Sequence, residues 1–345
     1  MTHIPQANGE PTERSHDGLR IAVLVPCYNE APTIASVIAG FRAALPDAGI
    51  HVYDNNSKDD TAAIARAHGA EVRHVGYQGK GHVVRRMFAD IEADIYLMAD
   101  GDGTYAPEDA PQLINTLLTE RADMVVGTRR GVTDDAGRTG HAFGNRLFNS
   151  LYKRLFGRDF TDIFSGYRAF TRRFVKSFPA VSGGFEIETE MSVHASQLKL
   201  PVSEIALDYG RRVEGSSSKL STFRDGSRIL WMFVMLLKET RPMRFFGAFS
   251  VLFLGASLFL MTPVLIEYGE TGLVPRLPTW VLSVALMLLS ILMAVTGLIL
   301  DSVSRGRAEQ KRVFYLSLPS SRTRTRERAQ VAGLENQAGK TPRAA

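Results

Sequence analysis

Two carboxylates at the end of an apolar run are the residues of this sequence with the clearest chemical potential. Asp100 and Asp102 follow the apolar residues 95–99, and Gly101 and Gly103 make the segment a tight turn. Mg²⁺ binds to proteins through one or two carboxylates and takes its other ligands from water and substrate phosphates. The pair therefore predicts a divalent-cation site that serves a nucleotide diphosphate.

Predicted strands place these carboxylates at the edge of a sheet. Short β-branched runs alternate with helical patterns, which predicts an α/β domain with a largely parallel sheet. The predicted strands are Ile21 to Val25, Ile50 to Tyr53, Glu71 to Val75, Asp94 to Ala99 and Asp123 to Val126. Ligands of such sheets bind outside the carboxyl ends of the strands. We therefore expect the loops after the strands to form the functional site.

Four polar or glycine-containing segments lie in those loops. They are Pro26-Cys27-Tyr28-Asn29-Glu30, Asp54-Asn55-Asn56-Ser57, Gly79-Lys80-Gly81 and Asp100-Gly101-Asp102. Each has a simple structural alternative: the second could be a turn that caps the next helix, the third an ordinary loop, and the fourth a common Asp-Gly turn. The third is not a P-loop, because no Ser or Thr follows Lys80. Their joint occurrence at successive strand ends favours a functional interpretation.

The segment 101–106 also matches the dinucleotide-binding fingerprint G-x-G-x-x-G/A. That loop packs its backbone against a pyrophosphate, whereas here Asp102 stands between the two glycines and Pro107 follows the motif. A carboxylate beside a pyrophosphate needs a cation between them. We therefore prefer the metal-site interpretation.

The C-terminal third contains two long apolar segments. Phe245 to Ile266 and Leu277 to Leu300 carry no charge, and each exceeds the roughly 20 residues that a membrane-spanning helix needs. Basic residues flank the outer ends of the pair, namely Arg241, Arg244, Arg305, Arg307, Lys311 and Arg312. The positive-inside rule then predicts an integral protein of the inner (cytoplasmic) membrane with its catalytic domain and both termini in the cytosol. A buried hairpin of a soluble protein is the alternative interpretation.

These patterns divide the chain into five predicted parts. They are a polar leader (1–18), an α/β catalytic domain (19–222), an interfacial amphipathic helix (223–243), a two-helix transmembrane hairpin (244–302) and a basic tail (303–345). The leader and the tail have the composition of disordered segments. The net charge of +5 suits an anionic membrane surface, and we expect no nucleic-acid partner because no recognition motif accompanies the charge. The single cysteine excludes an internal disulfide.

Six motifs in one order resemble the family 2 glycosyltransferases, and within them the polyprenyl-phosphate transferases typified by dolichyl-phosphate mannose synthase. The resemblance extends from about Ile21 to Leu220. Its motifs are residues 25–30, 52–61, 79–81, 100–102, 162–168 and 212–220.

The resemblance implies a GT-A fold that binds a UDP- or GDP-linked sugar and transfers the sugar, with inversion, to undecaprenyl or dolichyl phosphate. It implies Mg²⁺ or Mn²⁺ as the cofactor, coordinated by Asp102 with help from Asp100. The implied donor-binding residues are Pro26, Tyr28, Glu30, Asp54, Lys80 and Asp100. Thr104 stands where some relatives have a metal-binding Gln, so the third protein ligand stays open.

The acceptor phosphate needs cations more than it needs a base. A phosphate monoester has a second pKa of about 6, so near neutrality it is itself the nucleophile. The candidate phosphate ligands are Arg129, Arg146, Arg168, Arg212 and Lys219, each of which could also be a solvated surface residue. One extra serine shifts Lys219 relative to the family pattern. Asp162 is a candidate catalytic residue that orients the acceptor or acts as a base, and capping of a turn is its structural alternative.

Two other functions fit the same residues. One is a membrane protein that binds a nucleotide sugar without turnover, and the other is a transferase that acts on another lipid or on a polysaccharide. Two spanning helices are few for a polysaccharide channel. The motifs leave the donor open between hexoses and N-acetylhexosamines, and they leave homo-oligomerisation open.

Overall fold

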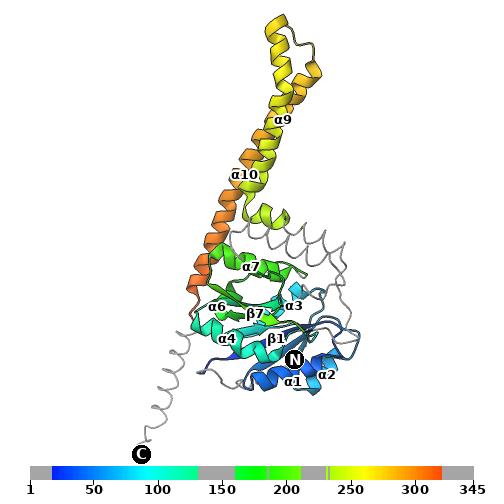
Figure 1. Cartoon of the computed structure of the whole chain (residues 1–345), viewed down its shortest axis with the longest axis vertical. Coiled ribbons are helices and arrows are strands. Elements are labelled where there is room, and N and C mark those ends of the chain that lie inside the picture. Colours follow the sequence, from blue (N-terminus) through cyan, green and yellow to red (C-terminus); the bar gives the residue numbers. More distant parts are fainter. Residues whose placement is uncertain (1–17, 131–159, 185, 211–230, 232–233, 321–345) are drawn as a thin grey trace, which may run out of the picture. The chain divides into compact units, whose positions relative to one another are not determined.

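The computed structural model describes residues 18–130, 160–184, 186–210, 231 and 234–320. The chain divides into two compact units, one formed by residues up to 222 together with those from 313 onward, and the other by residues 223–312. The strands of the first, α/β unit are β1 (Ile21–Cys27), β2 (Gly49–Asp54), β3 (Glu71–His74), β4 (Ile95–Met98), β5 (Met124–Arg130), β6 (Arg168–Thr171) and β7 (Val202–Asp208). Its helices are α1 (Ile34–Ala44), α2 (Thr61–Ala67), α3 (Lys80–Asp90), the 3₁₀ turn η1 (Pro107–Asp109), α4 (Ala110–Thr119), α6 (Arg172–Ser177) and α7 (Ile187–Leu198) (Figure 1).

The seven strands form one mixed sheet in the order β3-β2-β1-β4-β6-β5-β7. Strands β1, β2, β3 and β4 run parallel, and Cys27 at the end of β1 lies opposite Asp54 at the end of β2. Every residue of β1 is buried, as expected for a central strand that helices cover on both faces. The loops after β1, β2 and β4 therefore leave the sheet at one edge, and the predicted fold class is confirmed.

Strands β6 and β7 are not among the strands predicted from the sequence, and β6 also reverses the direction of the sheet. It pairs antiparallel with both β4 and β5, while β5 pairs parallel with β7. Strand β6 has only four residues and carries a buried arginine, so no alternation of apolar and polar residues marks it. Strand β5 is thereby displaced one position from β4.

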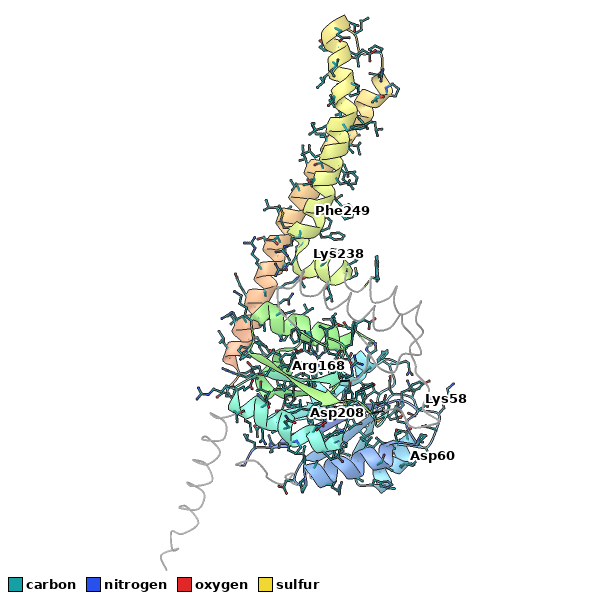
Figure 2. The ribbon with its side chains drawn as sticks, viewed as in Figure 1. Lys58, Asp60, Arg168, Asp208, Lys238 and Phe249 are labelled. Carbon is teal, nitrogen blue, oxygen red and sulfur yellow. The ribbon has the colours of Figure 1, made fainter. Side chains whose placement is uncertain are left out.

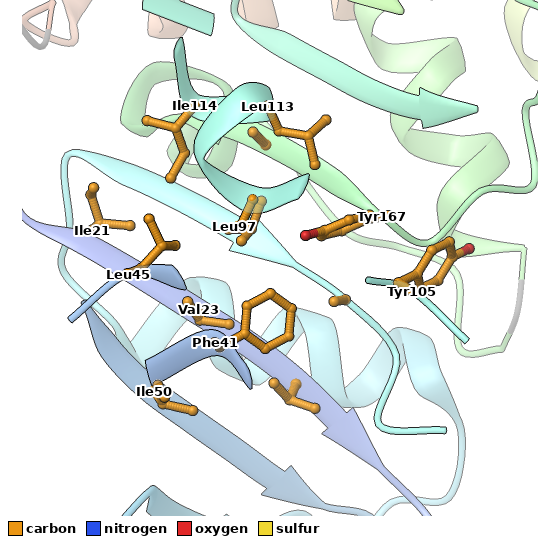
Figure 3. Packing of buried hydrophobic residues seen from close by; sticks show 14 of the residues in the cluster. Ile21, Val23, Phe41, Leu45, Ile50, Leu97, Tyr105, Leu113, Ile114 and Tyr167 are labelled. Carbon is orange, nitrogen blue, oxygen red and sulfur yellow. The ribbon is translucent and has the colours of Figure 1, made fainter. Parts of the chain in front are cut away.

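Two apolar layers pack on the two faces of the sheet. On one face, Phe41 and Leu45 from the region of α1 and Leu113 from α4 cover Val23 and Leu97 (Figure 3). On the other face, ring contacts join a cluster of aromatic side chains, namely Phe88, Phe170, Phe174, Phe178 and His194. Each fully buried large apolar side chain contributes roughly 1.5–3 kcal/mol, so these layers fix the strand ends on which the site is built.

The end of the last helix belongs to the α/β unit. The Tyr315 hydroxyl donates to Asp123 Oδ2 at 2.7 Å, and Arg173 lies over the Tyr315 ring at 5.0 Å and donates to the carbonyl of Leu318 at 2.7 Å. The helix that contains Tyr315 thus continues well beyond residue 302, the predicted end of the hairpin, whereas most of the predicted tail lies outside the described residues.

The second unit contains two helices of membrane-spanning length, α9 (Pro242–Thr271) and α10 (Leu277–Ser317). Small residues lie between them: Ser257 Oγ donates to the carbonyl of Ser283 at 2.7 Å, and Ser290 Oγ donates to that of Ser250 at 2.8 Å. Large apolar side chains face outward instead, as on a helix pair that meets lipid. The two long apolar helices suggest membrane association. Of the predicted interfacial helix (223–243), residues 231 and 234–243 are described: 231 and 234–240 are helical, Arg241 is not, and Pro242 already begins α9.

Candidate active site

The loops after β1 and β2 are held together by their own polar side chains. The backbone N–H of Asn29 donates to Ser57 Oγ at 2.9 Å, and that of Lys58 donates to Asn29 Oδ1 at 2.8 Å. Asn29 and Asn56 both have left-handed backbone conformations, which asparagine tolerates better than most residues. The two predicted nucleoside-binding loops are therefore one connected unit.

Asp54 and Asn55 differ in how far the protein satisfies their polar side-chain atoms. The Asn55 amide donates to the carbonyls of Val75 and Tyr77 at 2.9 and 2.7 Å, and its oxygen accepts from the N–H of Gly79 at 2.7 Å. Asp54 Oδ2 accepts from the N–H of Ser57 at 3.3 Å, whereas its buried Oδ1 has no hydrogen-bond partner among the described residues. An unsatisfied buried acceptor is costly, so an N–H donor on a ligand would find a prepared partner here.

The other predicted residues of the first loop lie at the same edge. Pro26 is buried within β1, Tyr28 is half-buried, and Glu30 is buried. The N–H of Glu30 donates to Thr61 Oγ1 at 2.8 Å, which ties this loop to the start of α2.

Lys80, Asp100 and Glu188 form a buried ion cluster. Lys80 Nζ contacts Asp100 Oδ1 and lies 2.5 Å from Glu188 Oε1. The side chains of Lys80 and Glu188 are 9% and 5% exposed, and that of Asp100 is 31% exposed. Burial alone would lower the pKa of Lys80, but the two carboxylates outweigh burial and raise it. Lys80 is therefore a protonated side chain that is already engaged by the protein.

Thr104 orients the second carboxylate of the turn. Its N–H and its hydroxyl both donate to Asp102 Oδ1, at 3.2 and 2.6 Å, and both residues are buried. The residue that stands in the place of a possible third metal ligand thus positions Asp102.

The carboxylates of Asp100 and Asp102 fit a cation that takes its other ligands from a substrate phosphate. Within the described ranges, no three His, Cys, Asp or Glu side chains are grouped to hold a metal by themselves. Asp100 and Asp102 are two hard carboxylates on one turn after β4, and Asp100 remains partly exposed. Mg²⁺ and similar ions are bound in this way, through one or two carboxylates plus substrate phosphates.

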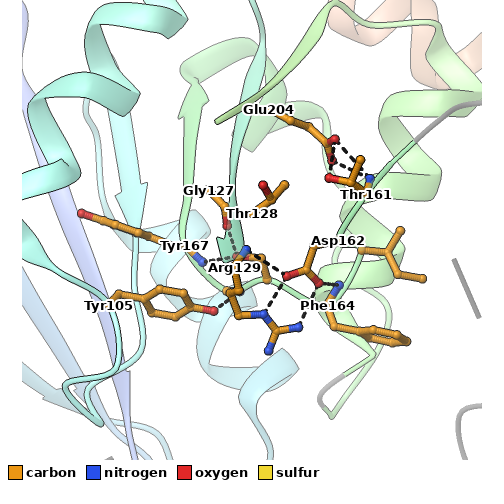
Figure 4. Close-up of polar contacts among 12 residues, drawn as sticks. Tyr105, Gly127, Thr128, Arg129, Thr161, Asp162, Phe164, Tyr167 and Glu204 are labelled. Atoms are coloured by element: carbon orange, nitrogen blue, oxygen red, sulfur yellow. Dashed lines mark hydrogen bonds and ion pairs between the residues drawn. The ribbon is translucent and has the colours of Figure 1, made fainter. Parts of the chain in front are cut away.

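Arg129 and Asp162 form a second ion pair at the end of β5. Arg129 Nε donates to Asp162 Oδ2 at 2.6 Å and Nη2 donates to Oδ1 at 2.9 Å, so the pair is bidentate (Figure 4). The guanidinium also lies over the Tyr209 ring, 5.4 Å from its centroid. Such a pair holds Arg129 in one orientation. The structure thus brings together two predicted residues that lie 33 positions apart in the sequence.

Arg168 and Glu204 anchor the loop that carries Asp162. Figure 2 shows Arg168 within the α/β unit, where its side chain is fully buried. It donates to the carbonyls of Ser165 and Ile163, both at 2.8 Å. Glu204 accepts from the N–H and the hydroxyl of Thr161, as Figure 4 also shows. A guanidinium bound in this way supports the loop and does not face a ligand, so we do not retain Arg168 as a phosphate ligand. Arg146, Arg212 and Lys219 lie outside the described residues.

Tyr105 connects the two ion clusters. Its hydroxyl accepts from the N–H of Gly166 at 2.9 Å, and its ring lies 5.4 Å from the ring of Tyr209. Sequence reasoning missed Tyr105, Tyr209, Glu188 and Glu204. Of these, Glu188 could have been found, because it is an acidic residue on the buried face of α7 together with Met191 and Ala195.

Gly166 gives a direct test of the first ion cluster. A Cβ at this position would lie 2.8 Å from Asp100 Oδ2 and 3.1 Å from Lys80 Nζ. We expect Gly166→Ala to displace both groups and to lower turnover by roughly 10-fold or more, since a small misplacement of a positioned group is enough for such a loss. Steady-state kinetics would check this. Gly76→Ala is the matched control, because nothing lies within 4 Å of its added Cβ, and equal activity of both variants would contradict the described contact.

The Arg129–Asp162 pair predicts a pH dependence of stability. Burial alone would raise the pKa of Asp162, but the hydrogen bonds and charge of Arg129 lower it below the usual aspartate range. The stabilisation is therefore complete above the ordinary aspartate pKa of about 3.9 and is lost as the pH falls through the lowered value. We expect the melting temperatures of wild type and Asp162→Asn to differ at pH 6 and to converge in acid. A difference that stays constant with pH would contradict an ionised, paired Asp162.

Comparisons with known proteins identify the family to which this chain belongs. Residues 22–178 match the sequence profile of the family described as Glycosyl transferase family 2. The glycosyltransferase AglJ of Haloferax volcanii is 34% identical over 299 residues, which cover 86% of this chain and 98% of AglJ. The chain therefore belongs to glycosyl transferase family 2, and it is a glycosyltransferase.

Two further proteins that are similar to this chain have ligands in their descriptions. The undecaprenyl-phosphate mannosyltransferase of Micrococcus luteus is 27% identical over 221 residues, which cover 58% of this chain and 87% of that protein. Glucosyl-3-phosphoglycerate synthase from Mycobacterium tuberculosis, in a complex with Mn²⁺, UDP and phosphoglyceric acid, is similar with a TM-score of 0.53 and 25% identity, over 64% of this chain and 78% of that one. The predicted GT-A fold is thereby confirmed.

Proposed function

We propose that this chain transfers a sugar, with inversion, from a nucleotide-sugar donor to a polyprenyl phosphate, in a reaction that depends on Mg²⁺ or Mn²⁺. One observation carries the proposal: a family 2 site with both carboxylates of the Asp100–Asp102 turn and two helices of membrane-spanning length occur in one chain. The similarity to an undecaprenyl-phosphate mannosyltransferase supports the acceptor. The Mn²⁺ and UDP of the synthase complex support the cation and the nucleoside diphosphate.

On the donor side, the loop of Pro26, Tyr28 and Glu30 and the buried Oδ1 of Asp54 bind the nucleoside. Asp54 Oδ1 would accept an N–H from the base, and both uracil and guanine present one. Asp100 and Asp102 would hold the cation, which when bound neutralises charge on the leaving diphosphate. Lys80 orients Asp100 through the contact described above.

On the acceptor side, the phosphate oxygen forms a bond with the anomeric carbon while the bond from that carbon to the diphosphate oxygen breaks, and the nucleoside diphosphate leaves. The phosphate is already largely dianionic near neutral pH, so no base is required. Arg129 Nη1 has no hydrogen-bond partner among the described residues and would bind the phosphate, with Arg146, Arg212 and Lys219 as further candidate ligands. Asp162, which Arg129 engages fully, holds Arg129 in position and is not proposed as the base.

The apolar hairpin would keep the enzyme at the plane in which the acceptor phosphate lies. The basic residues at both outer ends of α9 and α10 favour cytosolic termini and a cytosolic catalytic domain in an inner (cytoplasmic) membrane. We propose the domain bounds that were predicted from the sequence, with a catalytic domain at 19–222 and a hairpin that starts at 244. Self-association through the hairpin remains an expectation.

A panel of donors tests the proposal. Membranes that contain the full chain are supplied with radiolabelled UDP-glucose, UDP-N-acetylglucosamine or GDP-mannose, with and without undecaprenyl phosphate, and extracted into organic solvent. We expect one donor to label the lipid only when the polyprenyl phosphate is present, and we expect EDTA to abolish labelling and Mn²⁺ or Mg²⁺ to restore it. Labelling that survives exhaustive chelation would refute the metal role. Transfer to soluble 3-phosphoglycerate in place of the lipid would refute the acceptor.

A further inference from the structure

We propose that Glu188 is a positioning residue, which holds Lys80 so that the ammonium group binds one oxygen of Asp100 and leaves the other oxygen to the donor site. The inference deepens the proposed function and rests on its metal site. It assigns a role to a side chain that no motif of the sequence singled out.

Three separate elements meet at the Lys80 ammonium group. Lys80 is the first residue of α3, Asp100 follows β4, and Glu188 lies in the first turn of α7. Nζ contacts Asp100 Oδ1 and Glu188 Oε1, whereas no described residue forms a hydrogen bond with Asp100 Oδ2. The position of Asp100 therefore depends on where Lys80 is held.

The flexibility of the Lys80 side chain explains why a second hydrogen-bond acceptor is needed. A lysine on a flexible four-carbon stem forms hydrogen bonds in several directions, so an ammonium group bound only to Asp100 could turn to either oxygen or to a donor phosphate. The buried ammonium group of Lys80 also needs acceptors for its N–H groups. Glu188, with its side chain 5% exposed, supplies the second partner from a different helix and restricts Lys80 to one placement.

The backbone fixes the distance between α3 and α7 independently of this ion pair. The Glu190 carboxylate accepts from the N–H groups of Val181 and Ser182, at 2.9 and 2.7 Å. The carbonyls of residues 182 and 183 lie against Gly81 and Gly79, where any Cβ would clash with them. The segment before α7 thus packs directly on the start of α3, so Glu188 is presented to Lys80 by a close backbone contact.

The test measures metal binding as well as turnover. Mn²⁺ is titrated into the detergent-solubilised full chain in the presence of UDP or GDP, and free Mn²⁺ is read by EPR. We expect Glu188→Ala to weaken Mn²⁺ binding and to lower kcat by roughly 10-fold each, in the range found when a group that orients a metal ligand is removed. Glu188→Gln should retain most of the Mn²⁺ affinity and most of kcat, because its amide oxygen still accepts a hydrogen bond from Lys80. Glu92→Ala, which removes a surface partner of Arg172 and Lys176, is the control and should match wild type.

The outcomes separate this inference from the proposed function. Wild-type Mn²⁺ affinity and kcat in a folded Glu188→Ala variant would overturn the positioning role, and so would equal losses in the Gln and Ala variants, which would indicate charge alone. If the Ala variant does not fold, Glu188→Asp provides the same readout, because its shorter carboxylate is expected to lose the contact with Lys80. If Asp102→Asn binds Mn²⁺ as wild type does, the metal site itself is refuted, whatever Glu188 does.

Discussion

Replacement of Asp102 by asparagine should abolish sugar transfer while the protein stays folded. The amide of the Asp102→Asn variant would keep an oxygen that accepts from the N–H and hydroxyl of Thr104, so the turn after β4 is retained. The lost charge removes the buried carboxylate proposed to bind the cation that faces the diphosphate. We expect turnover to fall by roughly 10²–10³-fold or more, which is typical when one group that stabilises a developing negative charge is removed.

Lipid-linked product, melting temperature and Mn²⁺ binding measured side by side would check this. Asp109→Asn is the matched control. Burial and the nearby Asp208 and Glu108 raise the pKa of Asp109, so neutralising this carboxylate removes repulsion and should leave transfer intact. Near-normal transfer by Asp102→Asn would contradict a metal site on this turn.

Loss of the Arg129 side chain should reduce both stability and acceptor use. Arg129→Ala leaves the Asp162 carboxylate buried and unpaired, and breaking a buried pair in this way typically costs about 3–5 kcal/mol. The variant also lacks the guanidinium proposed to bind the acceptor phosphate. We therefore expect a lower melting temperature and a higher KM for polyprenyl phosphate, with the donor KM less affected.

A double variant separates the two effects. Replacement of a buried pair by apolar residues of similar volume is often neutral for stability, so Arg129→Met with Asp162→Leu should recover the melting temperature but not the acceptor KM. Arg129→Lys keeps the charge without the bidentate geometry and should be intermediate. If Arg129→Ala melts like wild type and uses the lipid normally, the ion pair and the phosphate role are both wrong.

Local sequence patterns were sufficient to predict the strand ends that carry the proposed donor-binding residues. Strand periodicity located β1, β2 and β4, and the topology of a parallel sheet then placed the loops at Glu30, Asp54 and Asp100 at one edge. The two apolar helices could be predicted just as directly, because their length and lack of charge are evident in the sequence.

The remaining features depend on contacts between residues far apart in the sequence. No local pattern shows that Arg168 points into the interior of the α/β unit or that Arg129 meets Asp162 across 33 residues. The pairing of Lys80 with Glu188 is similar, since its partners lie on different helices. Charged residues are normally expected at the surface, so a prediction from composition alone assigns them to solvent.

The reversed direction of β6 makes a seam in the sheet. Among the described strands, β1 to β4 run parallel, and β6 is the strand that joins β5 and β7 to them. We therefore expect insertions in the part of the β5–β6 connection that precedes Asp162 to leave the register of β1 to β4 unchanged, whereas Gly166, near the end of that connection, has to keep its place beside Asp100. We expect a chimera cut at this seam to keep the strands that precede Asp54 and Asp100, and its products would show whether the proposed acceptor specificity follows β5 and β7.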